Sequence, residues 1–489
     1  MKKTIIANFL VTVVVSVLLF VLQKVFAMSL GKDLLGLWKL FFSYMGIIKL
    51  FDFGVFTVST QALYKPFANK NRKEIDIIIS TLEDVYRKVF WAVLTVGVLL
   101  GFCLPWIIDS FKSEYYVYWY IFVVSESVFY FSLKYKSYFI ANGEYLYVVV
   151  TEGMIKTAVL LSQIFVLMGI KSFGLFLTLY LFQALLLYFV YHLRFRRYYV
   201  YTKTPVKEVE ILKNLKNMFW HKIGTVAVFG TDNIVLAKFI SLAVVAVYTT
   251  YLLIYQAVII FANVLTNVFS PKIGIYMTKF NADEIYLFWR RFMSFYLFLS
   301  LFFCWALFLF INDFIKLWMG TEFLLPKLTV FLILLNLFLH INRIIIDVFK
   351  NNFGIFEDIY NPLLETLLNL FISLVLVKPF GINGVLIGTV LSNLVVVYYF
   401  KPLILYKKGF NKEKKEFFLD LFKWFLAVLV ISGELYLFVN MVKPPEVYSW
   451  TGFVKNVIIY SLMILTVLGV NFWAVKDFRK FIRWVRYED

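Results

Sequence analysis

The 489-residue sequence is poor in the residues that build disulfide frameworks and metal centres. It has two cysteines, Cys103 and Cys304, both inside apolar runs, and three scattered histidines. Cysteines in such runs are expected to act as small apolar side chains, and no spacing resembles a zinc or thioredoxin-like site. We therefore expect no metal and no cofactor.

Charge is also scarce, because only 16% of the residues are charged while 62% are hydrophobic. The mean hydropathy is +0.81. A soluble domain cannot hide so much apolar surface, so the composition predicts an integral membrane protein surrounded by lipid. The formal net charge of +19 does not indicate a nucleic-acid partner, since the basic residues sit in short loops between apolar runs.

Apolar runs of about 20–25 residues, the length that crosses a bilayer, predict about fourteen helical spans. The N-terminal run is too long for a signal peptide and contains Lys24, so it is taken as the first permanent helix. The predicted spans are 5–29, 34–62, 86–108, 116–138, 147–169, 172–193, 220–240, 243–269, 291–314, 324–348, 358–378, 382–404, 421–441 and 454–475.

The basic residues predict the orientation of these spans. Of the 49 lysines and arginines, 36 fall on one side, nine on the other and four inside spans. This bias predicts that both termini are cytoplasmic. The outer loops are all short, so they have no room for an outer catalytic domain. The longest segments between spans, near 64–85, 194–219 and 405–420, are basic, which suits topology and contact with anionic lipid.

Weak matches recur about 200 residues apart. Pro66 and Pro271 close the second and eighth spans, and Cys103 and Cys304 lie in the third and ninth. Six spans per repeat is an even number, so both copies have the same orientation, as in some transporters. The predicted fold is an all-α membrane protein with two six-helix lobes around a central cavity. We assign 1–195 to the N-lobe, 196–219 to a basic cytoplasmic linker, 220–405 to the C-lobe, and 406–489 to two appended spans and a basic tail.

The predicted second span, Leu34 to Leu63, is interpreted as one helix although it contains Lys39, Lys49 and Asp52. An ionisable group near the bilayer centre costs ~2.5–3.5 kcal/mol on insertion scales. Lys49 and Asp52 are three residues apart and share a helix face. They form either one wall of a polar cavity or a structural ion pair. Lys24 and Lys39 lie near outer span ends, where they either line the cavity or extend to the interface.

Further polar residues inside spans are candidates for lining this cavity. Glu152 and Lys156, four apart, suit either the cavity or an ion pair. Arg343 and Asp347 have the same spacing near a cytoplasmic end, which suits an ion pair at a gate or an interface as well as substrate binding. The remaining cavity candidates are Glu126, Asp232, Tyr255, Glu365 and Asn369.

Several short segments together form a family pattern. They are Leu30-Gly31, Leu35-Gly36-Leu37, Leu50-Phe51-Asp52-Phe53-Gly54, Asp232-Asn233-Ile234-Val235-Leu236-Ala237, Ala246-Val247-Tyr248, Asn342-Arg343 and Gly381-Ile382-Asn383-Gly384. These segments resemble the bacterial polysaccharide transporters of the multidrug/oligosaccharidyl-lipid/polysaccharide (MOP) flippase superfamily. The resemblance implies a non-enzymatic flippase in the bacterial cytoplasmic membrane, sufficient as a monomer. Its substrate would be an undecaprenyl-pyrophosphate-linked oligosaccharide, moved from the inner to the outer leaflet by alternating access.

Other function classes were weighed against this one. A cation-coupled drug antiporter of the same superfamily needs an acidic cavity, whereas the first two spans carry three lysines and one aspartate. Asp232 is the candidate for a coupling ion, H⁺ or Na⁺. A membrane glycan polymerase or glycosyltransferase would need a large catalytic loop, and a scaffold gives no reason for so many mid-membrane charges.

Overall fold

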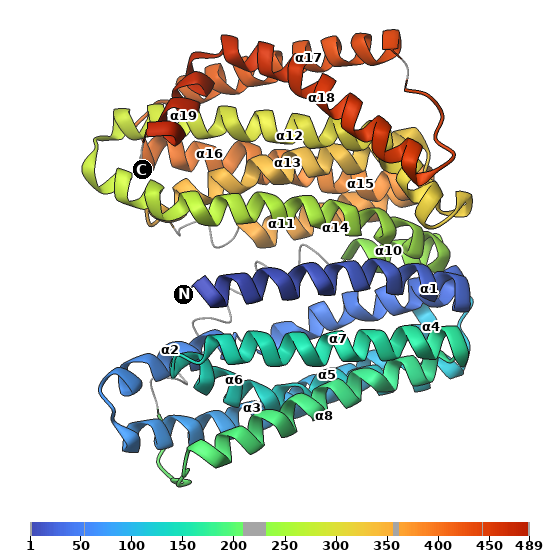
Figure 1. Ribbon diagram of the computed structural model, residues 1–489, viewed down its shortest axis with the longest axis vertical. Coiled ribbons are helices and arrows are strands. Elements are labelled where there is room, and N and C mark those ends of the chain that lie inside the picture. The colour runs from blue at the N-terminus through green and yellow to red at the C-terminus, as the bar shows by residue number, and fades with distance from the viewer. Residues whose placement is uncertain (1, 53, 209–230, 356–360, 443, 488–489) are drawn as a thin grey trace. The chain divides into compact units, whose positions relative to one another are not determined.

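The computed structural model describes residues 2–52, 54–208, 231–355, 361–442 and 444–487. Within these ranges every regular element is a helix, which confirms the all-α prediction (Figure 1). The chain divides into two compact units, Met1–Ala246 and Val247–Asp489. The predicted lobe boundaries at 195 and 220 remain predictions, because 209–230 lie outside the described residues.

In the first unit, long α1 packs along α7, while α5 packs on α8 and on α3. Phe26 and Trp38 stack at 5.2 Å between ring centroids and are almost fully buried. The elements are α1 (Lys2–Ile48), η1 (Lys49–Asp52), α2 (Val55–Ala68), α3 (Arg72–Gly101), α4 (Leu104–Ile107), α5 (Glu114–Val128), α6 (Tyr130–Ala141), α7 (Tyr145–Gly169), α8 (Phe173–Tyr198) and α10 (Thr231–Phe239).

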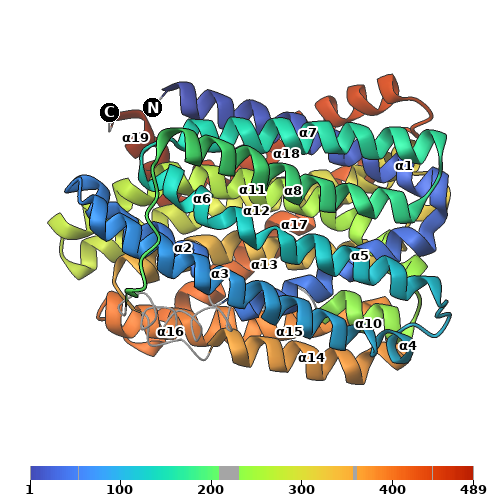
Figure 2. The same ribbon diagram turned by 90° about the horizontal axis from the view of Figure 1, so that it is seen from below.

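In the second unit, α12 packs on α13, and α14 and α15 lie side by side (Figure 2). A Cβ atom on Gly384 of α15 would lie 2.1 Å from Leu376 O of α14, so only glycine permits this approach. The elements are α11 (Leu242–Lys279, beginning in the first unit), α12 (Ala282–Trp318), η2 (Thr321–Phe323), α13 (Lys327–Asn352), α14 (Asn361–Phe380), α15 (Ile382–Ser392), π-helical η3 (Asn393–Phe400), α16 (Lys401–Ile404), π-helical η4 (Leu405–Gly409), α17 (Lys414–Val442), α18 (Trp450–Ala474) and α19 (Lys476–Tyr487).

Ten helices among the described residues are long and apolar enough to cross a membrane, so the chain is a multi-pass membrane protein. The total of about fourteen stays a prediction. Two predicted spans, 5–29 and 34–62, correspond largely to the single apolar stretch Ile6–Ile48, which is broken at Gly31 (φ 83°, ψ 175°). The predicted span 116–138 is covered by α5 and α6, which meet at Phe129.

The prediction of one continuous helix from Leu34 to Leu63 is wrong. α1 ends at Ile48, a 3₁₀ turn covers Lys49–Asp52, and Gly54 is left-handed (φ 66°, ψ 25°) before α2 begins. The Asp52 carboxylate accepts a hydrogen bond from Gly54 N at 2.9 Å. A short acidic side chain that binds nearby backbone in this way competes with the helix, and glycine accepts the positive φ that follows.

The interpretation of the two matched prolines is partly corrected. Pro66 lies in the last turn of α2, which ends at Ala68 as expected. Pro271, however, lies inside α11, which continues to Lys279. The helix therefore extends beyond the apolar span through a polar segment, so this proline does not end it.

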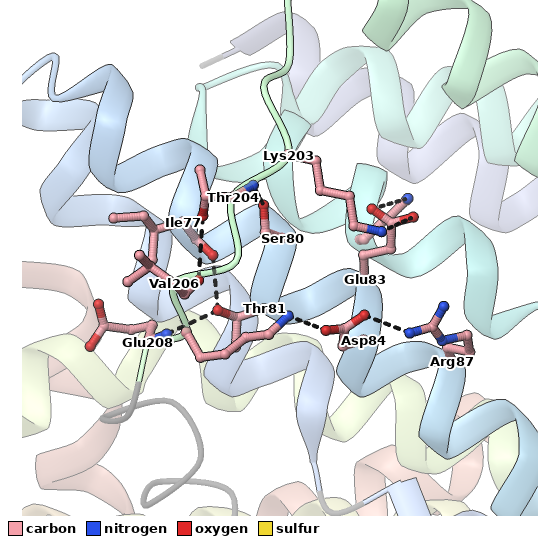
Figure 3. Close-up of polar contacts among 12 residues, drawn as sticks. Ile77, Ser80, Thr81, Glu83, Asp84, Arg87, Lys203, Thr204, Val206 and Glu208 are labelled. Atoms are coloured by element: carbon pink, nitrogen blue, oxygen red, sulfur yellow. Dashed lines mark hydrogen bonds and ion pairs between the residues drawn. The ribbon is translucent and has the colours of Figure 1, made fainter.

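The chain that follows α8 lies in extended form along the first half of α3 (Figure 3), and we call residues 199–208 the strap. Two α3 hydroxyls bind strap backbone, since Ser80 Oγ accepts from Thr204 N and Thr81 Oγ1 accepts from Glu208 N, each at 3.0 Å. Lys207 pairs with Asp84. This part of the predicted linker is therefore fixed to the first unit.

Candidate functional site

The first polar cluster lies where two predicted spans are interrupted. Lys49 Nζ forms an ion pair with Glu126 Oε2 at 2.7 Å, and Tyr130 OH donates to Asp52 Oδ2 at 3.3 Å. Lys49 and Asp52 belong to η1, whereas Glu126 and Tyr130 flank the junction of α5 and α6. We call these four residues the Lys49 cluster. The Lys49 side chain is 40% exposed, so it can also contact a further group.

Hydroxyl groups along α2 form further polar contacts after the Lys49 cluster. Tyr86 OH donates to Ser59 Oγ at 3.3 Å, and Thr60 Oγ1 donates to Ser137 Oγ at 3.3 Å. Ser59 and Ser137 are fully buried. These bonds join α2 to α3 and α6, and they hold the broken second span in place on both sides.

Two further lysines of α1 have no acidic partner within the described residues. Lys24 and Lys39 are both half-buried, and Lys39 Nζ lies 4.4 Å from the centroid of the Trp38 ring. Ser43, one turn after Lys39, accepts a hydrogen bond from Asn233 Nδ2 of α10 at 2.8 Å. The protein therefore covers this part of α1 on the side of α10. A lysine side chain that faced lipid instead would be costly.

Of the two interpretations of Glu152 and Lys156, the ion pair does not form. Glu152 Oε1 lies 2.9 Å from Lys136 Nζ, and Tyr191 OH donates to the same oxygen at 3.1 Å. Lys156 is exposed and lies in no ion pair within the described residues. The i, i+4 spacing permits a contact along one helix, but here the carboxylate turns to α6 and α8, which offer two donors.

The second unit contains a larger charge network, which we call the Arg343 cluster. The predicted neighbours Arg343 and Asp347 are confirmed as a pair, with Nε and Oδ2 3.4 Å apart. Arg343 Nη1 also lies 2.6 Å from Glu365 Oε1, and Lys401 Nζ lies 2.9 Å from Asp347 Oδ1. The network thus joins α13, α14 and α16 and balances two cations with two carboxylates.

Sequence reasoning did not select Lys401, which lies at the predicted cytoplasmic end of the span 382–404 and is 3% exposed. It directly follows the π-helical η3. Glu365 is fully buried, and within the described residues its Oε2 accepts no hydrogen bond.

Asn369, one turn after Glu365 on the same face of α14, is also buried. Its Oδ1 accepts from Ser373 Oγ at 2.9 Å, and Thr389 Oγ1 lies 3.5 Å away. Both hydroxyls lie within 3.3 Å of Val385 O. Asn369 is therefore central to a polar contact between α14 and α15.

The last two candidates lie elsewhere. Tyr255 OH is 2.9 Å from His340 Nδ1, which joins α11 to α13. Asp232 is half-buried in the first described turn of α10, in the first unit. The rest of its predicted span, 220–230, lies outside the described residues. Among the described residues no group of histidine, cysteine, aspartate and glutamate is arranged to hold a metal ion.

No protein-family model matches the sequence, and no curated protein matches it. Solved structures do share its fold. The lipid II flippase MurJ in an inward closed conformation matches with a TM-score of 0.73 at 14% identity, over 96% of this chain and 99% of that chain.

Two MATE transporters match as well. An inward-facing MATE-family transporter of the MOP superfamily has a TM-score of 0.63 at 14% identity, over 78% of this chain and 92% of that chain. A variant of the Vibrio cholerae MATE transporter VcmN has a TM-score of 0.52 at 15% identity, over 82% and 96%. The chain therefore has the fold of MOP-superfamily transporters. The resemblance found in the sequence is confirmed at this level of fold.

Proposed function

We propose that the protein is a flippase for a polyprenyl-pyrophosphate-linked oligosaccharide such as a capsule, O-antigen or teichoic-acid unit. It would move this lipid from the inner to the outer leaflet of the bacterial cytoplasmic membrane by alternating access. The superfamily fold suits either a lipid flippase or a drug transporter, so the choice rests on the charges of the membrane-embedded polar sites.

The observation that carries the proposal is the excess of cations on α1 and η1. Glu126 is paired with Lys49, and Asp52 accepts bonds from Gly54 N and Tyr130 OH. Lys24 and Lys39 have no acidic partner in the described part of the chain. A pyrophosphate is bound well by such lysines, because it supplies the negative charge that the helices lack.

A cation-coupled drug antiporter is the second candidate. It is favoured by the buried carboxylate of Glu365, whose Oε2 accepts no hydrogen bond in the described residues, because acidic side chains inside a membrane commonly mark ion pathways. The same carboxylate is compatible with a cation-coupled flippase. A coupling ion, H⁺ or Na⁺, is therefore part of both proposals, and the substrate separates them.

The test uses depletion of the protein in its host and complementation with variants. We expect depletion to leave the lipid-linked glycan in the inner leaflet, and Lys24→Gln/Lys39→Gln to export at least about tenfold less than the unaltered protein, because the anion loses two cations. Lys24→Arg/Lys39→Arg should retain most export. Lys112→Gln, which removes an exposed lysine from an outer loop, is the control.

Two outcomes contradict the proposal. The first is full glycan export by the double glutamine variant at a normal protein level. The second is depletion that raises sensitivity to cationic drugs while glycan export continues, which would support the antiporter.

A further inference from the structure

The C-terminal helix α19 is strongly amphipathic and follows the membrane helix α18 after the single residue Val475. Phe478, Phe481 and Trp484 recur every three residues and are 6%, 2% and 8% exposed. Since a helix turns by about 100° per residue, these three side chains share one face. The helix is therefore attached to the protein by its apolar side.

The surface that receives this face is a row of phenylalanines on α12, which lies beside α19 (Figure 1). Phe481 stacks on Phe295 at 4.4 Å between centroids, and Trp484 lies 5.3 Å from Phe292. Arg290 Nη2 also binds Asp477 Oδ2 at 3.0 Å. Aromatic packing and this ion pair fix the rotation of α19, so its opposite face has a set direction.

Five basic side chains gather on the opposite face. They occupy one arc of about 120° on a helical wheel, and none of them lies in an ion pair within the described residues. The only acidic residue of α19, Asp477, is already bound by Arg290. The basic residues are Lys476, Arg479, Lys480, Arg483 and Arg486, of which all but Lys480 are exposed.

Exposed apolar side chains adjoin the basic arc. Ile482, one turn before Arg486, is partly exposed, and Trp473 at the end of α18 is 59% exposed. A tryptophan at the end of a membrane helix commonly lies at headgroup level. The surface thus combines an apolar edge with fixed arginines at the place where the bilayer ends, a pattern typical of an interfacial helix.

We propose that the exposed face of α19 binds the headgroups of anionic phospholipids. Arginine forms paired hydrogen bonds with a phosphate diester, and clustered basic residues beside a membrane helix attract anionic lipid. The apolar edge favours lipid over a soluble acidic partner, which would need no such edge. This inference does not depend on which substrate the protein moves.

The test is native mass spectrometry of the full-length protein in detergent, titrated with phosphatidylglycerol or phosphatidylcholine. We expect phosphatidylglycerol to bind with a lower apparent Kd than phosphatidylcholine. Arg479→Gln/Arg483→Gln/Arg486→Gln should reduce that preference by at least about fivefold, because each basic residue near an anionic surface adds to the attraction. The arginine-to-lysine triple variant should keep most of it, since it keeps the charge.

The matched control is Lys112→Gln/Lys171→Gln/Lys378→Gln, which removes three exposed positive charges from the predicted outer loops. It should keep the preference for phosphatidylglycerol. An equal loss in the control would show that only total charge matters, and an unchanged preference in the arginine-to-glutamine variant would show that lipid binds elsewhere. Either result overturns the proposal. Size-exclusion profiles of all variants confirm folding before titration.

Discussion

At the scale of single residues, the membrane-embedded charges fall into two groups. Lys49 and Arg343 have carboxylate partners on other elements. The positive charge in each cluster is therefore partly neutralised. Lys24 and Lys39 have no such acidic partner in the described residues. The first group therefore holds helices together, and under the proposed function the second group attracts the anionic substrate.

The Lys49–Glu126 pair allows structure and transport to be separated. Glu126→Gln removes the partner of Lys49, and because Lys49 is 40% exposed, solvent screening should limit the loss of stability to about 1 kcal/mol. The charge-reversed variant Lys49→Glu/Glu126→Lys should regain the thermal stability of the detergent-solubilised protein. It should not regain glycan export, because a carboxylate at position 49 repels pyrophosphate. Recovery of both together would make the pair purely structural.

The pairings at this scale could be predicted only within one helix. The i, i+4 spacing gave the Arg343–Asp347 contact. The partners of Lys49, Glu152 and Asp347 on other elements lie 16 to 77 positions away in the sequence, and a single sequence holds no signal for such contacts. The same i, i+4 argument failed for Glu152, because a neighbouring helix supplied a better-placed lysine.

At the scale of secondary-structure elements, the interruption at Lys49–Gly54 is the main departure from the predicted helices. Hydropathy locates long apolar helices well, since lipid requires every backbone group to be bonded within the segment. Hydropathy does not reveal a break of four or five residues within such a helix. Broken helices in transporters commonly lie at binding sites, where freed backbone groups face a cavity.

The conformation of Gly54 gives a test of this break. A residue with a side chain is strained at φ 66°, ψ 25°, so we expect Gly54→Ala to lower stability by roughly 1–2 kcal/mol. Gly54→Asn should be better tolerated, because asparagine accepts the left-handed region more readily. Thermal unfolding in detergent measures the difference. Equal stability of all three proteins would show that the chain does not need a left-handed residue there.

The strap offers a second test at this scale. Trypsin can cut after Lys203 or Lys207 only when the strap leaves α3. We expect Ser80→Ala/Thr81→Ala, which removes the acceptors for Thr204 N and Glu208 N, to speed this cleavage at least about fivefold. Ser162→Ala, which removes a hydroxyl bound to its own helix on α7, is the control. Similar cleavage rates in all proteins would contradict a strap held by these bonds.

The pairing of Lys207 with Asp84 also predicts how cleavage of the strap varies with pH. The Lys207 ammonium bound to Asp84 holds the pKa of that carboxyl below its ordinary value of 3.8. A lowered folded-state pKa adds stability that is complete above the ordinary value and is lost as the pH falls below it. The ratio of cleavage rates for Asp84→Asn and the unaltered protein should therefore stay constant from about pH 6 to about 8.5. A change within that range would mean that another group controls the strap.

At the scale of the whole molecule, the sequence predicted the superfamily fold from degenerate motifs and a weak internal repeat, and the structural matches agree at that level. The positive-inside bias and the length of apolar runs reflect how each helix interacts with the membrane. They can therefore be read from the sequence without knowing which helices contact each other. The number of spans depends on how broken or charged helices such as α3 and α5–α6 are counted. Length and hydropathy alone do not settle that number.

Labelling of single cysteines can settle the topology. In a protein with Cys103→Ala and Cys304→Ala, we expect a membrane-impermeant maleimide applied to whole cells to label cysteine at three predicted outer positions and at none of three predicted inner ones. Permeabilised cells should show all six, because each native residue is exposed. The outer positions are 112, 171 and 448, and the inner positions are 70, 142 and 407.

Position 142 is the most informative of the six. It follows α5 and α6, so labelling from outside would mean that this pair does not cross the membrane as one span. The first unit would then contain an odd number of spans before the linker, and the two repeats would have opposite orientations. Protection of position 142 together with labelling at 171 would instead support parallel repeats.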